Sequence, residues 1–97
     1  MSKFFLSQKA NKDIEDVFYY IAKENPVAAK ETIQKLFSTF KFLSENPGIG
    51  HSREDLTKRN LRFFTVKKHY MVVYKQFDNK IEITRVISSY RNVGKVL

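Results

Sequence analysis

The residues of this chain that could do chemistry are cations and aromatic side chains in its second half. Arginine and lysine stabilise anionic oxygens, and tyrosine offers a ring for stacking and a hydroxyl for hydrogen bonding. The set consists of Arg62, Lys67, Lys68, Arg85, Tyr90 and Arg91. These side chains suit the binding of a phosphate or of an acidic side chain.

Two kinds of activity are compatible with this set. An RNA-cleaving enzyme could use Arg62, Arg85 and Arg91 to stabilise charge on a phosphate, with Tyr90 or His69 transferring protons. A protein that only binds an anionic partner would use the same cations without any proton transfer. The residue types fit both.

Other catalytic arrangements find little support. The chain has no cysteine and two histidines far apart in sequence, so we expect no thiolate chemistry, no metal site and no cofactor. Glu82 stands alone in its strand and Asp78 falls in a turn, which leaves no carboxylate pair for hydrolysis. Ser88 and Ser89 lack the context of a nucleophile elbow, and no glycine-rich phosphate loop occurs.

Positive charge is concentrated in the same half of the chain. Residues 1–48 carry a net charge of +1, whereas residues 49–97 carry +7 of the total of +8. A basic surface of this kind indicates an anionic partner, which could be a nucleic acid, an acidic peptide or an acidic protein surface.

Two of the arginines interrupt apolar strand faces. Arg62 shares a face with Phe64, and simple alternation places Arg85 in phase with Ile83 and Ile87. A charge beside apolar groups is costly unless it is paired. Each arginine therefore either pairs with an acceptor of its own fold or binds an anion of a partner.

Three predicted strands position these residues. Runs that alternate with the two-residue period of a strand cover residues 61–66, 70–77 and 80–88. A tight basic turn from Val66 to His69 joins the first two, and Asp78-Asn79 suits a two-residue hairpin loop between the second and third. We expect an antiparallel meander with apolar groups on both faces.

The first half of the chain predicts a short strand and a helical hairpin. Residues 3–6 form the strand, Ser7 caps a helix that ends near Glu24, and Asn25-Pro26 starts a second helix that stops at Asn46. The expected buried stripes are Ala10, Ile14, Val17 and Ile21, widened by Phe18 and Ala22, in the first helix and Ala29, Ile33, Leu36, Phe37, Phe40 and Leu43 in the second.

These elements predict a single α+β domain over residues 1–97, with the helical hairpin on one face of the sheet. The other sheet face would then be left for a partner to cover. Residues 50–60 read as a polar loop. Neither a membrane helix nor a signal peptide is present in the sequence, so we expect a soluble, cytoplasmic protein.

Several ordered motifs resemble the RelE/ParE superfamily of bacterial toxins, and the ParE branch most. They are DVFYYIAKENPVAA, FLSENPGIGHSREDL, LRFFTVKKHYMVVYK and IEITRVISSYRN. The similarity extends from Phe5 to about Asn92. It rests on Asn25-Pro26, Ala28-Ala29, Leu43, Pro47-Gly48, Gly50, Leu56, Arg62, Tyr70, Tyr74, Arg85-Val86 and Arg91.

The resemblance implies a plasmid-stabilisation type of toxin that a cognate antitoxin neutralises. In ParE-like members the target is DNA gyrase, and in RelE-like members the toxin cuts messenger RNA on the ribosome. Relatives commonly carry a histidine where this chain has Ser88, and an Arg-Asp pair where it has Arg91-Asn92. The missing histidine favours a non-enzymatic gyrase poison over a ribonuclease. An inactive relative that only binds its antitoxin is a third possibility.

The expected partners are therefore an antitoxin and DNA gyrase, without sequence-specific binding of nucleic acid. Apolar side chains that the helical hairpin leaves exposed should contact the antitoxin, together with the basic sheet face for its acidic residues. The candidates are Phe18, Tyr19 and Tyr20, which could equally be ordinary residues at the edge of the core.

Overall fold

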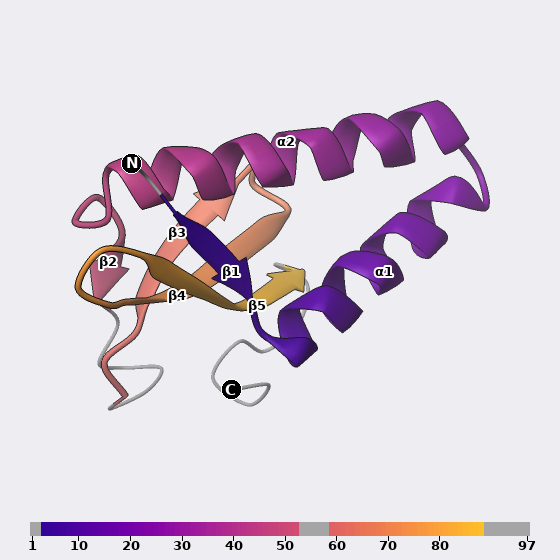
Figure 1. Cartoon of the computed structure of the whole chain (residues 1–97). Helices are drawn as coiled ribbons and strands as arrows, with labels where there is room; N and C mark the ends of the chain where they lie inside the picture. Colours follow the sequence, from indigo (N-terminus) through magenta and orange to yellow (C-terminus); the bar gives the residue numbers. More distant parts are fainter. Residues whose placement is uncertain (1–2, 53–58, 89–97) are drawn as a thin grey trace.

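The computed structural model describes residues 3–52 and 59–88, which form two helices packed on a five-stranded sheet (Figure 1). The elements in chain order are β1 (Phe4–Leu6), α1 (Gln8–Ala22), α2 (Pro26–Glu45), β2 (His51–Ser52), β3 (Arg62–Val66), β4 (Tyr70–Gln76) and β5 (Ile81–Ser88). The predicted α+β class, with a helical hairpin followed by an antiparallel meander, is confirmed.

The strands are arranged in the order β1-β5-β4-β3-β2. β1 runs parallel to β5, and the other pairs are antiparallel, so the sheet is mixed. The sequence prediction missed β2, since it assigned residues 50–60 to a loop. His51 and Ser52 instead pair with Phe63 and Arg62, whereas residues 53–58 of that loop lie outside the described residues.

Both helices begin where the sequence predicts. The Ser7 side chain accepts a hydrogen bond from the backbone N–H of Ala10, and the Asn25 side chain accepts one from that of Ala28. In each bond the nitrogen lies 3.0 Å from the oxygen. Pro26 occupies the first turn of α2, where its missing N–H costs nothing. These caps fix the short connection between the helices.

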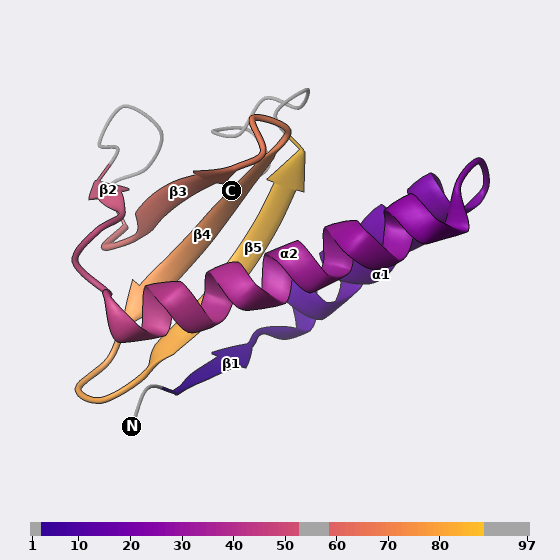
Figure 2. The same cartoon turned by 90° about the horizontal axis from the view of Figure 1, so that it is seen from above.

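The helical hairpin extends beyond the sheet, and Figure 2 shows its connecting turn well outside the strands. The buried residues of α1 are therefore confined to its first half, at Ala10, Asp13 and Ile14. The predicted stripe is correct there, but Phe18 is 37% exposed because no strand lies beneath it. In α2 four of the six predicted residues are buried, namely Ala29, Leu36, Phe40 and Leu43. Phe37 is instead 38% exposed, and Thr32 and Thr39 are buried in addition.

The sheet has apolar clusters on both faces. The larger one, which includes Leu36 and Phe40 of α2, Val72 of β4 and Ile83 of β5, fills the space between helices and sheet. A second cluster on the opposite face consists of Leu61, Phe63, Val73 and Ile87, with Met71 packed against it. The first four are at most 2% exposed. The expectation that a partner must cover this face is therefore wrong for this cluster, which the chain itself buries.

An irregularity in β5 changes which residues share a face. Val73 pairs with Arg85 but the next residue, Tyr74, pairs with Ile83, so Thr84 is an extra residue in β5. The bulge reverses the alternation, and Ile83 and Ile87 belong to clusters on opposite faces. The prediction that Arg85 is in phase with both isoleucines is wrong because single-sequence alternation contains no signal for this bulge.

The turn between β3 and β4 has an unusual backbone. Lys67 and Lys68 have φ values of 54° and 64°, in the left-handed region that lysine rarely adopts. Positive φ at both central residues is the geometry of a type I′ hairpin turn, for which Asn-Gly is the favoured sequence. The tight basic turn is thus confirmed, and its lysines carry a conformational cost.

We expect the double substitution Lys67→Asn and Lys68→Gly to stabilise the fold. Asparagine and glycine tolerate positive φ, so the free energy of unfolding should rise by about 1–2 kcal/mol. The measurement is the midpoint of urea unfolding. The matched control, Lys67→Gln with Lys68→Gln, removes the same charge but keeps the strain, and an equal stabilisation by the control would show that charge repulsion is the cause.

Neither of the two described helices combines the length with the apolar character that a bilayer crossing demands.

Candidate functional site: two anchored arginines and an exposed basic turn

Arg85 is held by a carboxylate of α1. Its Nε donates to Oδ2 of Asp13 at a distance of 2.8 Å, and its Nη2 donates to Oδ1 at 3.0 Å. The backbone N–H of Val86 also donates to Oδ2 over 2.9 Å. Asp13 is 8% exposed, so this is a largely desolvated, bidentate ion pair with an additional backbone donor.

This contact occurs where β1 has ended and the edge of β5 would otherwise lack a partner. Ser7 completes the edge, since its backbone N–H donates to the carbonyl of Ile83 over 3.0 Å and its hydroxyl to that of Thr84 over 2.7 Å. Asp13 then takes the next donor, the N–H of Val86. We refer to the contacts of Ser7 and Asp13 with β5 as the edge clasp.

The guanidinium of Arg85 thus binds a carboxylate of its own chain. The hydrogen bond to Asp13 raises its pKa above the ordinary value, with a further contribution from the charge of that carboxylate, against the opposing effect of burial. The sequence left two interpretations of Arg85, an acceptor of its own fold or an anion of a partner. The structure shows the first.

Arg62 is also engaged by the fold. Its Nη1 donates to the carbonyl of Gly50 over 2.8 Å and approaches that of Gly48 at 3.5 Å. In the same region the hydroxyl of Tyr74 donates to the carbonyl of Pro47 over 2.7 Å and accepts from the N–H of Gly50 over 2.9 Å. These bonds attach the segment after α2 to the sheet.

Tyr74 and Gly50 fit closely in this network. Burial raises the pKa of the Tyr74 hydroxyl, although the bond from Gly50 and the charge of Arg62 act in the opposite direction. A Cβ atom at position 50 would lie 2.7 Å from Cε1 of Tyr74, which is too close for any side chain. Residue 50 must therefore be glycine for the ring to occupy its place.

Lys67 and Lys68 are the predicted cations that the structure leaves exposed, next to His69, which is exposed as well. The backbone from Arg62 to Lys67 covers about 16 Å at the usual strand rise, so Arg62 lies at the other end of β3. Tyr90 and Arg91 lie outside the described residues. Among the described candidates, the structure brings only Lys67, Lys68 and His69 together.

The aromatic residues of α1 are exposed, including Phe18, which was also predicted to lie on the buried stripe. Tyr19 is 65% and Tyr20 is 79% exposed, and the ring of Phe18 meets that of Tyr19 edge-on with centroids 5.7 Å apart. Val27, at the start of α2, is 67% exposed. The end of the helical hairpin therefore presents apolar surface outside the sheet.

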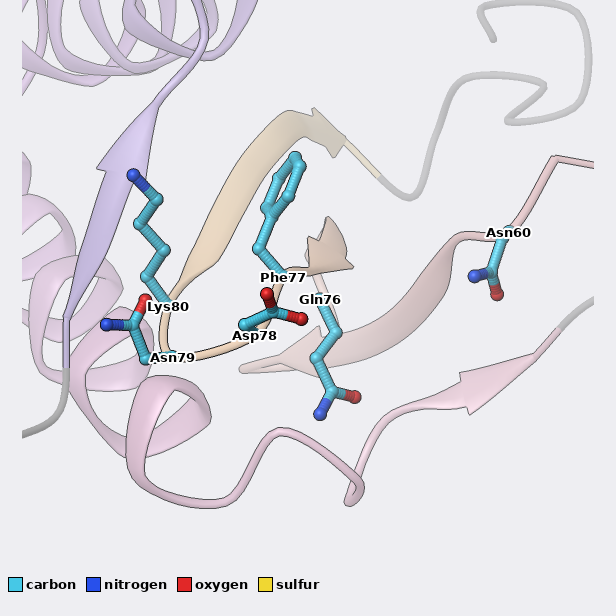
Figure 3. Close-up of a pocket in the computed structure, with 6 residues that line it drawn as sticks. All are labelled: Asn60, Gln76, Phe77, Asp78, Asn79 and Lys80. Carbon is cyan, nitrogen blue, oxygen red and sulfur yellow. The ribbon is translucent and has the colours of Figure 1, made fainter.

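A pocket lies beside the turn between β4 and β5. Its lining side chains are Asn60, Gln76, Phe77, Asp78, Asn79 and Lys80, and Figure 3 shows them pointing in different directions. The amine of Lys80 lies 5.2 Å from the ring centre of Phe5. In the described part of the chain, no three acidic, histidine or cysteine residues gather where they could hold a metal ion.

The sequence analysis did not identify Asp13, the residue that binds Arg85 within the fold. A signal was present, because Asp13 follows Ala10 by three residues and precedes Val17 by four, which places it on the buried stripe of α1. A carboxylate on such a stripe needs a buried partner, and Arg85 is the matching cation on an apolar strand.

The sequence model of a family described as the ParE toxin of the type II toxin–antitoxin system parDE matches residues 4–93. The chain belongs to the ParE toxin family. It is thus a ParE-type toxin of a type II toxin–antitoxin system, and an antitoxin partner is implied by the family. A search of curated proteins gave no match.

Solved structures support the fold of the toxin. A chromosomal ParDE toxin–antitoxin system from P. aeruginosa contains a chain that is 20% identical, with a TM-score of 0.76 over 91% of this chain and 96% of that one. HP0894, a conserved hypothetical protein from Helicobacter pylori, is 16% identical, with a TM-score of 0.57 over 94% and 98% of the two chains. At these identities the similarity establishes the common fold.

The substitution Asp13→Asn should destabilise the toxin by about 2–4 kcal/mol, because it removes the carboxylate charge from the largely desolvated pair with Arg85. Asp16→Asn is the matched control. Asp16 makes an exposed pair with Lys12 on the same helix, with 3.0 Å between Nζ and Oδ1, and its loss should leave the free energy of unfolding almost unchanged. Urea unfolding of both variants measures the difference, and equal effects would contradict the role assigned to Asp13.

Proposed function

We propose that this toxin acts by binding DNA gyrase and blocking its supercoiling cycle, without cleaving bonds itself. The observation that carries the proposal is the match to the ParE toxin family across residues 4–93. The basic second half of the chain supports it, because gyrase bound to DNA offers anionic surface.

The surroundings of the arginines also favour binding over catalysis. A ribonuclease would need free guanidinium groups to stabilise charge on the phosphate, but Arg85 is bound to Asp13 and Arg62 to the carbonyl of Gly50. In the proposed toxin these two arginines maintain the shape of the sheet. Lys67, Lys68, Tyr90 and Arg91 then supply the contacts to the target.

We further propose that the cognate antitoxin covers the end of the helical hairpin. The exposed side chains of Phe18, Tyr19 and Tyr20 form the surface concerned, and tyrosine is among the residues that contribute most at protein interfaces. Lysines on the sheet face would pair with acidic residues of the antitoxin.

The test is a supercoiling assay with purified gyrase. The wild-type toxin should inhibit supercoiling and yield cleaved DNA only when gyrase is present. Arg91→Ala and Tyr90→Ala should each raise the concentration needed for half-inhibition about tenfold, the effect of losing one well-placed interface side chain. Lys30→Ala, which removes one charge from an exposed position on α2, should change it less than about twofold.

An assay in a translation extract tests the ribonuclease alternative. Codon-positioned cuts in translated messages, with gyrase unaffected, would replace this proposal with the ribonuclease alternative. An absence of both effects would identify an inactive relative that only binds its antitoxin.

The antitoxin surface is tested by the double substitution Tyr19→Ala and Tyr20→Ala. It should weaken binding of the cognate antitoxin about tenfold or more, because two exposed aromatic anchors are lost, and leave gyrase inhibition unchanged. Phe77→Ala, at an aromatic residue 40% exposed beside the turn that follows β4, is the control and should bind normally. Calorimetric titration measures both, and equal affinities of the two variants would contradict this placement.

A further inference from the structure

Two phenylalanines form an exposed pair where β1 lies beside the turn between β4 and β5. The rings of Phe5 and Phe77 are 39% and 40% exposed, with their centres 6.0 Å apart and their planes inclined by 38°. Phe5 is the middle residue of β1, between Phe4 and Leu6, which pack against the larger apolar cluster. Strand alternation therefore directs Phe5 to the sheet face opposite the helices.

A lysine amine lies close to each ring. Nζ of Lys80 is 5.2 Å from the ring centre of Phe5, and Nζ of Lys75 is 5.4 Å from that of Phe77. Lys75 and Phe77 follow Val73 of the smaller apolar cluster at steps of two, which places them on the same face as Phe5. In Figure 3 the side chains of Phe77 and Lys80 project to the same side of the hairpin. We refer to Phe5, Lys75, Phe77 and Lys80 as the aromatic corner.

The backbone beneath the aromatic corner is held by hydrogen bonds. The N–H of Phe77 donates to the carbonyl of Lys80 at 2.8 Å, which closes the turn between β4 and β5. The N–H of Ile81 donates to the carbonyl of Lys3 at 3.1 Å, so β1 is joined to β5 at this end. Both rings therefore occupy their positions before a ligand arrives, and binding has few groups to order.

The charge around the corner is only slightly positive. Its charged residues are Lys3, Lys75, Asp78, Lys80 and Glu82, which sum to +1. Oε1 of Glu82 accepts a hydrogen bond from the hydroxyl of Thr84 at 3.0 Å, and within the described residues neither lysine of the corner forms an ion pair. This balance suits a ligand that combines flat apolar groups with isolated negative charges.

Single-stranded nucleic acid has this composition. Each nucleotide carries one base, whose face can stack on an aromatic ring, and one phosphate within reach of a flexible lysine side chain. A peptide with acidic and apolar side chains matches the charges too, but the rings lie on a face of the sheet, where a peptide backbone has no strand edge to pair with. A second copy of this chain, with a net charge of +8, would be repelled.

We propose that the aromatic corner binds single-stranded DNA without sequence preference. Two neighbouring bases stack on Phe5 and Phe77, and the amines of Lys75 and Lys80 move from the rings to the adjoining phosphates. The choice of DNA over RNA rests on the proposed function, in which the target acts on DNA. The corner shares no residue with the turn of Lys67 and Lys68 or with the aromatic surface of α1.

The test uses the whole chain with the substitution Phe77→Trp, because the sequence contains no tryptophan and the new ring keeps a stacking surface. A ten-residue thymidine oligonucleotide should quench the tryptophan fluorescence. A strand of the same length with abasic sites in place of all bases carries the same phosphates but cannot stack, so it should bind at least about tenfold more weakly.

Substitution of the rings tests stacking in the protein. Phe5→Leu should weaken binding of the thymidine oligonucleotide about tenfold, whereas Phe5→Tyr, which keeps a ring, should stay within about twofold. Phe42→Leu makes the same exchange at a ring of α2 that is 41% exposed, and it should change the affinity less than about twofold. Fluorescence anisotropy of the labelled oligonucleotide measures all three, and thermal unfolding confirms that the variants are folded.

The salt dependence of binding tests the lysines. Lys75→Gln combined with Lys80→Gln should reduce the slope of log affinity against log salt by about 1.4, because each phosphate contact on a single strand contributes about 0.7. Lys30→Gln combined with Lys41→Gln removes two charges from exposed positions on α2 and should leave the slope almost unchanged.

Three results would overturn the proposal. They are equal binding of the abasic strand, tighter binding of a ten-residue uridine oligonucleotide, and displacement of the thymidine strand by an equal concentration of the peptide acetyl-Glu-Leu-Glu-Leu-Glu-amide. Supercoiling assays separate this proposal from the gyrase proposal. Gyrase inhibition by a toxin that does not bind the oligonucleotide would contradict the DNA proposal alone, and oligonucleotide binding by a toxin that leaves gyrase active would contradict the gyrase proposal alone.

Discussion

The carboxylate of Asp13 is the contact on which the arrangement of helices and sheet depends. β1 pairs with β5 only as far as Ile83, and the bulge at Thr84 then turns Arg85 out of the alternation. Without an acceptor at this position, the N–H of Val86 would lack its hydrogen bond and the guanidinium of Arg85 would lose a bidentate carboxylate, which together cost several kcal/mol. Asp13 satisfies both groups at once and thereby joins α1 to the sheet edge.

Contacts within the fold also determine which of the described cations can meet a partner. Arg85 at the clasp and Arg62 at the carbonyl of Gly50 are both used inside the fold. The exposed turn of Lys67 and Lys68 keeps its charge available, at the cost of two residues in the left-handed conformation. A protein selected for stability alone would favour Asn-Gly in such a turn, so strain borne by two lysines is consistent with a role in binding.

Much of this fold could be predicted because its signals are local. The caps at Ser7 and Asn25 and the alternation in β3 and β4 depend on neighbouring residues, and all are as predicted. The bulge at Thr84, the exposure of Phe18 beyond the sheet and the pairing of β2 depend on contacts between distant segments, and single-sequence periodicity contains no information on them. The candidate site was predicted as a cluster of cations, but its two described arginines, Arg62 and Arg85, are each held by a partner within the fold. The sequence places Asp13 on the buried stripe of α1, but only the adjacency of α1 and β5 shows which cation it pairs with.

Amide hydrogen exchange at Val86 in the unmodified protein tests this account most directly. The N–H of Val86 has a side-chain carboxylate as its acceptor, whereas that of Val73 lies in β4 between two neighbouring strands. If the edge clasp is as stable as the rest of the sheet, the Val86 amide should exchange only through global unfolding, at a rate close to that of Val73. Exchange of Val86 that is orders of magnitude faster than that of Val73 would show that the contact opens independently of the core, and it would contradict the central role of Asp13.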